Sequence, residues 1–109
     1  MLDTSELTAA VERLADRLRV APQSRLQRGA AAEGLALARE LAVRAQAVET
    51  PGLEPRTVPD AGLFAVADQL VVVGTDLAEA LRTAPSPSRE RELVEAVRLV
   101  REAAERSGL

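Results

Sequence analysis

Cysteine and histidine are both absent from this sequence of 109 residues. Without cysteine there is no disulfide framework, no thiolate metal ligand and no thiol nucleophile. Without histidine the chain lacks the commonest catalytic base and the commonest ligand for transition metals. Serine and threonine fall almost entirely at expected helix ends and turns, with no histidine or lysine to activate a hydroxyl. The sequence therefore predicts a protein that is not an enzyme and that uses no cofactor and no metal.

Aromatic residues are scarce, and lysine is absent. Phe64 is the only aromatic residue, so the chain has no platform on which bases or sugars could stack. All 14 basic residues are arginine, and together with abundant alanine this indicates a GC-rich bacterial genome. The formal net charge of −3 disfavours attraction of the whole molecule to nucleic acid.

Long apolar runs are missing as well, and we expect no membrane-spanning segment. The sequence begins MLDTSEL, with acidic residues where a signal peptide carries positive charge, so we expect a cytoplasmic protein. A chain of this length is predicted to be a single domain over residues 1–109. Such a domain buries roughly two thirds of the surface of its unfolded chain, which is enough to fold without disulfides.

What the sequence does contain is the 3.6-residue apolar period of amphipathic helices. It occurs in four segments, which predict helices over residues 4–20, 25–49, 60–83 and 87–106. Each segment has a residue suited to the N-cap position at its start: Asp3, Ser24, Asp60 and Ser86. Gly108 is expected to end the last helix.

The third segment, residues 60–83, is predicted to be the most buried helix. Its apolar residues cover about half of the helix circumference, which is typical of a helix surrounded by others. The second segment has a small residue at every fourth position, namely Ala30, Gly34, Ala38 and Ala42. This spacing predicts that another helix approaches closely there. The alternative is that alanine is simply common in this chain.

Residues 50–59 read TPGLEPRTVP and predict a loop, because they contain three prolines and a glycine. At this length we expect the loop to cross the end of a bundle, with Leu53 and Val58 covering the core. A binding motif is the alternative interpretation. The other connections are short, and no segment shows the strict alternation of a half-buried strand. The prediction is an all-α fold, an antiparallel up-down bundle of four helices.

The carboxylates offer one candidate for chemistry. Asp68, Asp76 and Glu79 share the polar face of the third predicted helix, and carboxylate groups can bind divalent metals or transfer protons. Here they lie opposite the apolar face and lack the histidines of helical di-metal sites. We interpret them as a solvated helix face.

Two resemblances to known families rest on few residues. Glu92-x-x-Glu95 and Glu102-x-x-Glu105 resemble the Glu-x-x-Glu pairs of the helical nucleotide pyrophosphohydrolases, which implies a small carboxylate-metal enzyme as a third hypothesis. The match covers only these residues, in a helix dominated by Arg and Glu. The size and helical character of the chain resemble the small helical proteins of type VII secretion systems. Their Trp-Xaa-Gly turn has no counterpart, because the chain has no Trp.

The arginines are unevenly distributed. Five of them lie within residues 13–28, together with a single acidic residue, Asp16. In an up-down bundle the first and third turns share one end, which predicts an Arg-rich end that can bind an anion or an acidic partner. Its members are Arg13, Arg17, Arg19, Arg25, Arg28, Arg82, Arg89 and Arg91. Ordinary surface charge is the alternative, since Arg17 and Arg19 also suit the C-terminal dipole of the first helix.

Some apolar residues fall outside the predicted inner faces. If they gather in one patch, they mark an interface. These candidate interface residues are Phe64, Val71, Val72, Val43 and Leu99. The leading hypothesis is a non-enzymatic bundle that mediates protein–protein association, including its own dimerisation as a homo-oligomer. The alternative is binding of an anion or nucleic acid through the Arg-rich end, and salt dependence separates the two.

Overall fold

Four long helices make up this computed structural model, which describes residues 2–84 and 86–109. They are α1 (Ser5–Val20), α3 (Ala31–Glu49), α4 (Val66–Thr83) and α5 (Arg89–Ser107), and no strand occurs in the described ranges. A short helix, α2 (Gln23–Arg25), and a wide turn, η1 (Leu26–Ala30), connect α1 to α3. The prediction of an all-α protein with four packed helices is confirmed.

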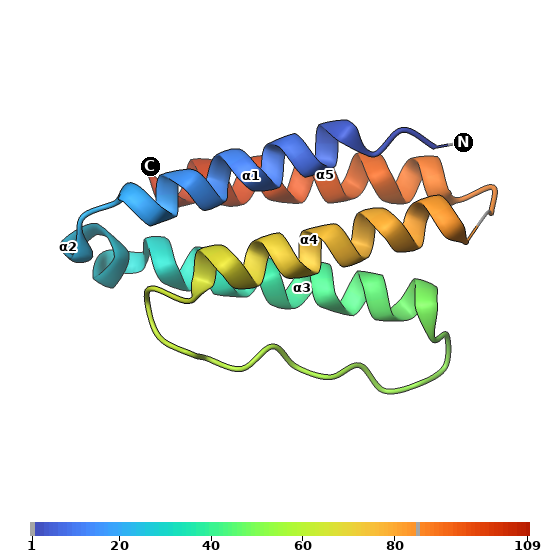
Figure 1. The fold of residues 1–109 in the computed structure, drawn as a ribbon, viewed down its shortest axis with the longest axis horizontal. Coiled ribbons are helices and arrows are strands. Elements are labelled where there is room, and N and C mark those ends of the chain that lie inside the picture. Colours follow the sequence, from blue (N-terminus) through green and yellow to red (C-terminus); the bar gives the residue numbers. More distant parts are fainter. Residues whose placement is uncertain (1, 85) are drawn as a thin grey trace.

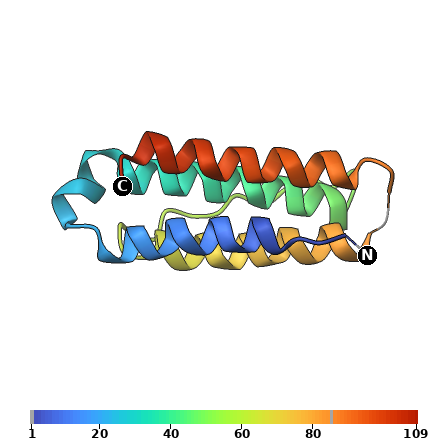
Figure 2. The same cartoon turned by 90° about the horizontal axis from the view of Figure 1, so that it is seen from above.

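The four helices are arranged as a square in cross-section. Helix α1 packs against α4 and α5, and α3 packs against the same two helices. Seen from above, α1 lies with α4 on one side of the molecule and α3 lies with α5 on the other (Figure 2). Helices α1 and α3, which follow each other in sequence, therefore occupy opposite corners.

The predicted antiparallel up-down order is wrong, because α3 and α4 run in the same direction (Figure 1). Gly34 near the start of α3 faces Val66 at the start of α4, and Val48 near the end of α3 shares a cavity with Leu81 near the end of α4. Helices α1 and α5 are parallel too. The remaining neighbours, α1 with α4 and α3 with α5, are antiparallel (Figure 1).

The connection over residues 50–65 explains the parallel pair. It runs back along α3 instead of crossing the end of the bundle (Figure 1). Sixteen extended residues reach about 50 Å, whereas α3 with its 19 residues is about 28 Å long. The expected lid is therefore wrong: Leu53 is exposed, and Val58 packs on the side of the core.

Three side chains of α3 and α4 hold this long loop by its backbone. The side-chain amide of Gln46 accepts from the Arg56 N–H at 2.7 Å and donates to the Arg56 carbonyl at 3.0 Å. Arg39 Nε donates to the carbonyl of Val58, and Gln69 Nε2 donates to the carbonyl of Pro59, both at 2.9 Å. The loop is thus fixed over the seam between the two parallel helices.

Helix α4 begins at Val66, six residues later than predicted. Asp60 does not cap it, because its Oδ1 accepts the N–H of Gly62 at 3.0 Å in a local turn. The intervening residues complete the crossover before the helix starts.

The predicted second helix, residues 25–49, is also interrupted. Gly29 has φ 140° and ψ −15°, a conformation that breaks the helix and that side-chain-bearing residues rarely adopt. Ser24 lies inside α2 and caps no helix.

The other helix ends differ less from the predictions. Thr4 rather than Asp3 occupies the N-cap of α1, although Asp3 Oδ1 accepts the Ser5 N–H at 2.9 Å. Ser88 rather than Ser86 precedes α5. Gly108 ends α5 in the left-handed conformation, as predicted, and its N–H donates to the Glu105 carbonyl.

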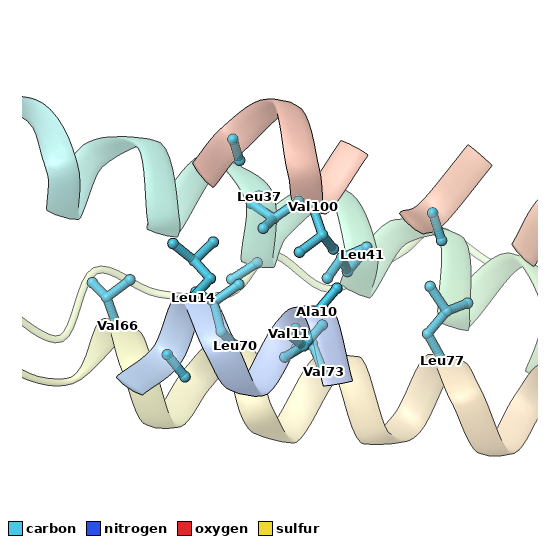
Figure 3. Close-up of a cluster of buried hydrophobic side chains, with 14 of the residues drawn as sticks. Ala10, Val11, Leu14, Leu37, Leu41, Val66, Leu70, Val73, Leu77 and Val100 are labelled. Atoms are coloured by element: carbon cyan, nitrogen blue, oxygen red, sulfur yellow. The ribbon is translucent and has the colours of Figure 1, made fainter. Parts of the chain in front are cut away.

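The core draws on all four long helices (Figure 3). Its largest fully buried side chains are Leu7, Leu41, Leu70, Leu77, Leu81 and Val100. Burying one such side chain stabilises the fold by about 1.5–3 kcal/mol. None of the helices in the described ranges combines the length and the apolar character that a bilayer crossing requires.

Candidate interaction surfaces

The predicted Arg-rich end does not form as one surface. Because α3 and α4 are parallel, the joint between α1 and α3 and the joint between α4 and α5 lie at opposite ends of the molecule (Figure 1). The arginines near the joint between α1 and α3 therefore lie at one end: Arg19, Arg25 and Arg28. Those near the joint between α4 and α5 lie at the other end: Arg82, Arg89 and Arg91.

Several of these arginines are already engaged. Arg19 pairs with Asp16 at 3.1 Å and with Asp68 at 2.9 Å, and the hydrogen bond to Asp68 is the main reason why the Arg19 pKa is raised. Arg25 donates to the carbonyl of Gly108. Arg19 thus connects α1 to α4, and Arg25 connects α2 to the end of α5. Because both side chains are already bonded within the protein, they are less available to bind an anion.

At the other end, Arg82 NH1 donates to Thr4 Oγ1 at 2.6 Å and links α4 to the start of α1. Arg89 pairs with Glu92 at 2.6 Å and donates to the carbonyl of Ala84. Four other candidates make no hydrogen bond or ion pair with any residue that the structure describes: Arg13, Arg17, Arg28 and Arg91.

Arg13 and Arg17 lie on the rim of a groove between the parallel helices α1 and α5. The groove has a volume of about 520 Å³. Its apolar wall includes Ala10, Leu14, Val100, Ala104 and Leu109. Its charged side chains are Arg13, Arg17, Arg101 and Glu105. Sequence reasoning found the two arginines but not the groove, because the groove depends on α5 lying beside α1.

The candidate interface residues do not form a single patch. Phe64 is 74% exposed and Val72 is 59% exposed, and both belong to α4 or to the turn before it. Val43 is 41% exposed on α3. The other two candidates, Val71 and Leu99, are half-buried and pack against the core.

Two exposed valines were missed by sequence reasoning. Val20, the last residue of α1, is 82% exposed, and Val94 on α5 is 69% exposed. Both fall outside the apolar stripe of their helix, and this position in the sequence pattern could have identified them as exposed. The ion pair between Arg19 and Asp68 places the end of α1 beside the first turns of α4, so Val20 and Phe64 belong to the same region.

Several carboxylates, including Asp68, Glu92, Glu95 and Glu102, form ion pairs with arginine. Arg98 donates to Glu95 at 2.9 Å and to Glu102 at 2.7 Å, and its hydrogen bonds lower the Glu95 pKa below the ordinary value. These two residues come from the Glu-x-x-Glu pairs of the sequence. Among the described residues, no group of three or more acidic side chains gathers closely enough to hold a metal ion.

Comparison with protein-family models, with curated proteins and with solved structures gives no match for this chain. The interpretation of its surfaces therefore depends on their chemistry.

Proposed function

We propose that this protein is a non-enzymatic bundle that associates with proteins, including a second copy of itself, through the apolar surface around Phe64. The observation that supports this is the position of Phe64, the only aromatic residue, which is 74% exposed. Burial of a phenylalanine in the core would stabilise the fold by about 1.5–3 kcal/mol. Aromatic side chains are enriched in the buried centres of protein interfaces, so contact with a partner would bury the exposed Phe64 ring.

The neighbourhood of Phe64 supports the same proposal. Val20 and Val72 are exposed, and Asp68, which pairs with Arg19 next to Val20, is four residues from Phe64 and four from Val72 in the sequence. A standard interface covers about 800 Å² on each partner, which is about one eighth of the 6369 Å² surface of this molecule. Three apolar residues do not fill that area, so polar residues of the outer face of α4 must form the rim, including Asp76 and Glu79.

We infer further that α4 is the most buried helix and organises the core. Its buried residues are Val66, Ala67, Leu70, Val73, Gly74, Leu77, Ala78, Ala80 and Leu81. Val72 lies on the outer face of the same helix, so a change at this residue alters the surface without opening the core.

Sedimentation equilibrium at low and high salt tests the proposal. We expect a dimer that persists at high salt, because burial of apolar surface is not screened by ions. Phe64→Glu and Val72→Glu should each shift the equilibrium to monomer by placing a charge in the interface. Val43→Glu is the matched control, since Val43 is exposed on a different helix, and this variant should remain dimeric.

A monomer at both salt concentrations would remove the self-association part of the proposal. Dissociation by Val43→Glu to the same extent as by Phe64→Glu would show that the Phe64 surface is not the interface.

The second candidate function is anion or nucleic-acid binding. The observation that favours it is that Arg13 and Arg17 have no acidic partner among the described residues. Fluorescence anisotropy with a labelled oligonucleotide at low salt tests it, because phosphate contacts weaken steeply as salt rises. Undetectable binding at low salt would exclude this candidate.

A further inference from the structure

The groove between α1 and α5 combines two features that call for different contacts. Its wall is apolar and includes the small residues Ala10 and Ala104, which leave room for another backbone to come close. Its rim is cationic on the α1 side, with Arg13 and Arg17, whereas the α5 side carries both Arg101 and Glu105. A ligand that fills this groove must therefore present apolar side chains to the wall and negative charge to the rim.

The rim carries more positive than negative side chains, because Arg13, Arg17 and Arg101 line the groove together with one acidic side chain, Glu105. Arg13 and Arg17 are four residues apart on one helix, a spacing at which like charges repel each other. Neither side chain pairs with an acidic residue in the part of the chain that the structure describes. Other arginines do form ion pairs, either within one helix, as Arg98 does with Glu102, or between helices, as Arg101 does with Glu6, both at 2.6 Å. Within a protein of net charge −3, this rim is a local site for an acidic partner.

The dimensions of the groove suit a helix. Its α1 side extends from Ala10 to Arg17, which is about 10 Å of helix, or two turns. A docked helix of two to three turns would present apolar residues at i, i+3 or i+4, and i+7 on the side that meets the wall. Acidic residues beside that apolar stripe would then lie opposite the arginines.

We propose that this groove binds an acidic amphipathic helix of a partner protein. A second copy of this chain fits less well. The acidic outer face of α4 carries Asp68, Asp76 and Glu79 but only one large exposed apolar residue, Val72. The groove lies on the α1–α5 side of the molecule and is separate from the Phe64 surface, so its occupation is independent of self-association.

The probe is a synthetic helical peptide of about 15 residues, with leucine at i, i+4 and i+7 and glutamate on both sides of that stripe. Two matched peptides control for its chemistry. In one, lysine replaces every glutamate, and in the other, serine replaces every leucine. Isothermal titration calorimetry on the full chain measures affinity, and NMR of methyl groups locates the site. We expect the first peptide to bind and to shift the methyl signals of Ala10, Val100 and Ala104.

Two variants test the two sides of the groove. Arg13→Glu with Arg17→Glu should weaken binding of the acidic leucine peptide by about tenfold or more, because attraction becomes repulsion. Ala104→Leu should also weaken it about tenfold by filling the wall. The control is Arg56→Glu with Arg91→Glu, which makes the same charge change at arginines outside the groove and should change affinity less than about twofold. Thermal melts of all variants verify that each remains folded.

Three results would overturn the proposal. The first is a dissociation constant weaker than about 1 mM for the acidic leucine peptide. The second is equal affinity for the lysine or serine peptide. The third is equal weakening by the control pair of charge reversals. Oligonucleotide binding that depends on Arg13 and Arg17, without peptide binding, would also reject the acidic helix and assign the arginines to phosphate.

Discussion

Gly34 shows, at the scale of single residues, how closely two helices pack in this alanine-rich bundle. A Cβ atom at this position would lie 2.6 Å from Val66 Cγ1 and 3.2 Å from Leu18 Cδ1. Sequence spacing predicted a close approach along this face of the second helix, and the structure places its small residues Gly34, Ala38 and Ala42 in the core. The spacing did not identify the partner, because that depends on which helix arrives from elsewhere in the chain.

Gly34→Ala is therefore expected to destabilise the protein despite the better helix propensity of alanine. The propensity gain is about 1 kcal/mol, whereas overpacking of a tight core costs about 1–3 kcal/mol. The branched Val66 side chain has little freedom to move aside. We expect the free energy of unfolding, measured by urea denaturation, to fall by about 1 kcal/mol, the middle of the resulting range of about 0–2 kcal/mol.

The matched control is the same change in a Val66→Ala background. There the contact at 2.6 Å is removed and only the end of the Leu18 side chain, at 3.2 Å, has to shift, so Gly34→Ala should stabilise the protein relative to Val66→Ala alone. A Gly34→Ala protein more stable than the unaltered chain would contradict the close approach of α3 and α4.

The chemistry of single residues also explains why several predicted N-cap residues do not cap a helix. Asp60 and Ser86 are good N-cap residues by type, yet each bonds locally within a turn, to Gly62 and Ser88 respectively. The side-chain oxygen of Asp or Ser stabilises a turn as readily as a helix start. Sequence alone does not distinguish the two, since the choice depends on where the chain must travel next.

At the scale of elements, the crossover over residues 50–65 is the least regular segment and the one on which the topology depends. It has no helix or strand of its own. Gln46 is its firmest attachment, because one side-chain amide bonds both backbone groups of Arg56. Leu53 is exposed, so apolar burial contributes little at the start of this segment.

Gln46→Leu should release this segment without unfolding the bundle. Loss of the two hydrogen bonds removes about 1–3 kcal/mol of local stability, which corresponds to at least a fivefold increase in the open state. Limited digestion with trypsin should therefore cleave after Arg56 about fivefold faster or more. Gln23→Leu is the control, because Gln23 is exposed in α2, away from the crossover. Unchanged cleavage after Arg56 in Gln46→Leu would show that the amide does not hold the loop.

At the scale of the whole molecule, the direction of the helices decides where charges meet. An up-down bundle would have brought both Arg-containing joints to one end. The parallel α3–α4 pair separates them. It also makes α1 and α5, the two helices that form the groove lined by Arg13 and Arg17, run in the same direction. The arginines were identifiable from the sequence. The groove beside them was not, because it forms only when α1 and α5 pack together.

The length of the crossover tests this topology. Deletion of residues 51–56 leaves ten residues, which reach about 33 Å and still span the 28 Å of α3. Deletion of residues 50–59 leaves six, which reach about 20 Å and cannot. We expect the first variant to unfold cooperatively in thermal denaturation followed by circular dichroism, and the second to lose cooperative unfolding. An up-down bundle would tolerate both deletions, so equal melting curves would contradict the parallel arrangement.

The sequence by itself determined the helices and the side of each that faces the core. The 3.6-residue period is local, and residues such as Leu14, Leu41, Leu70 and Val100 are buried where the period placed them. Only the tertiary structure decided the direction of α4, the break at Gly29 and the neighbour of each helix. These depend on the path of a flexible connection and on contacts between residues far apart in the chain, and a short-range period carries no information about either.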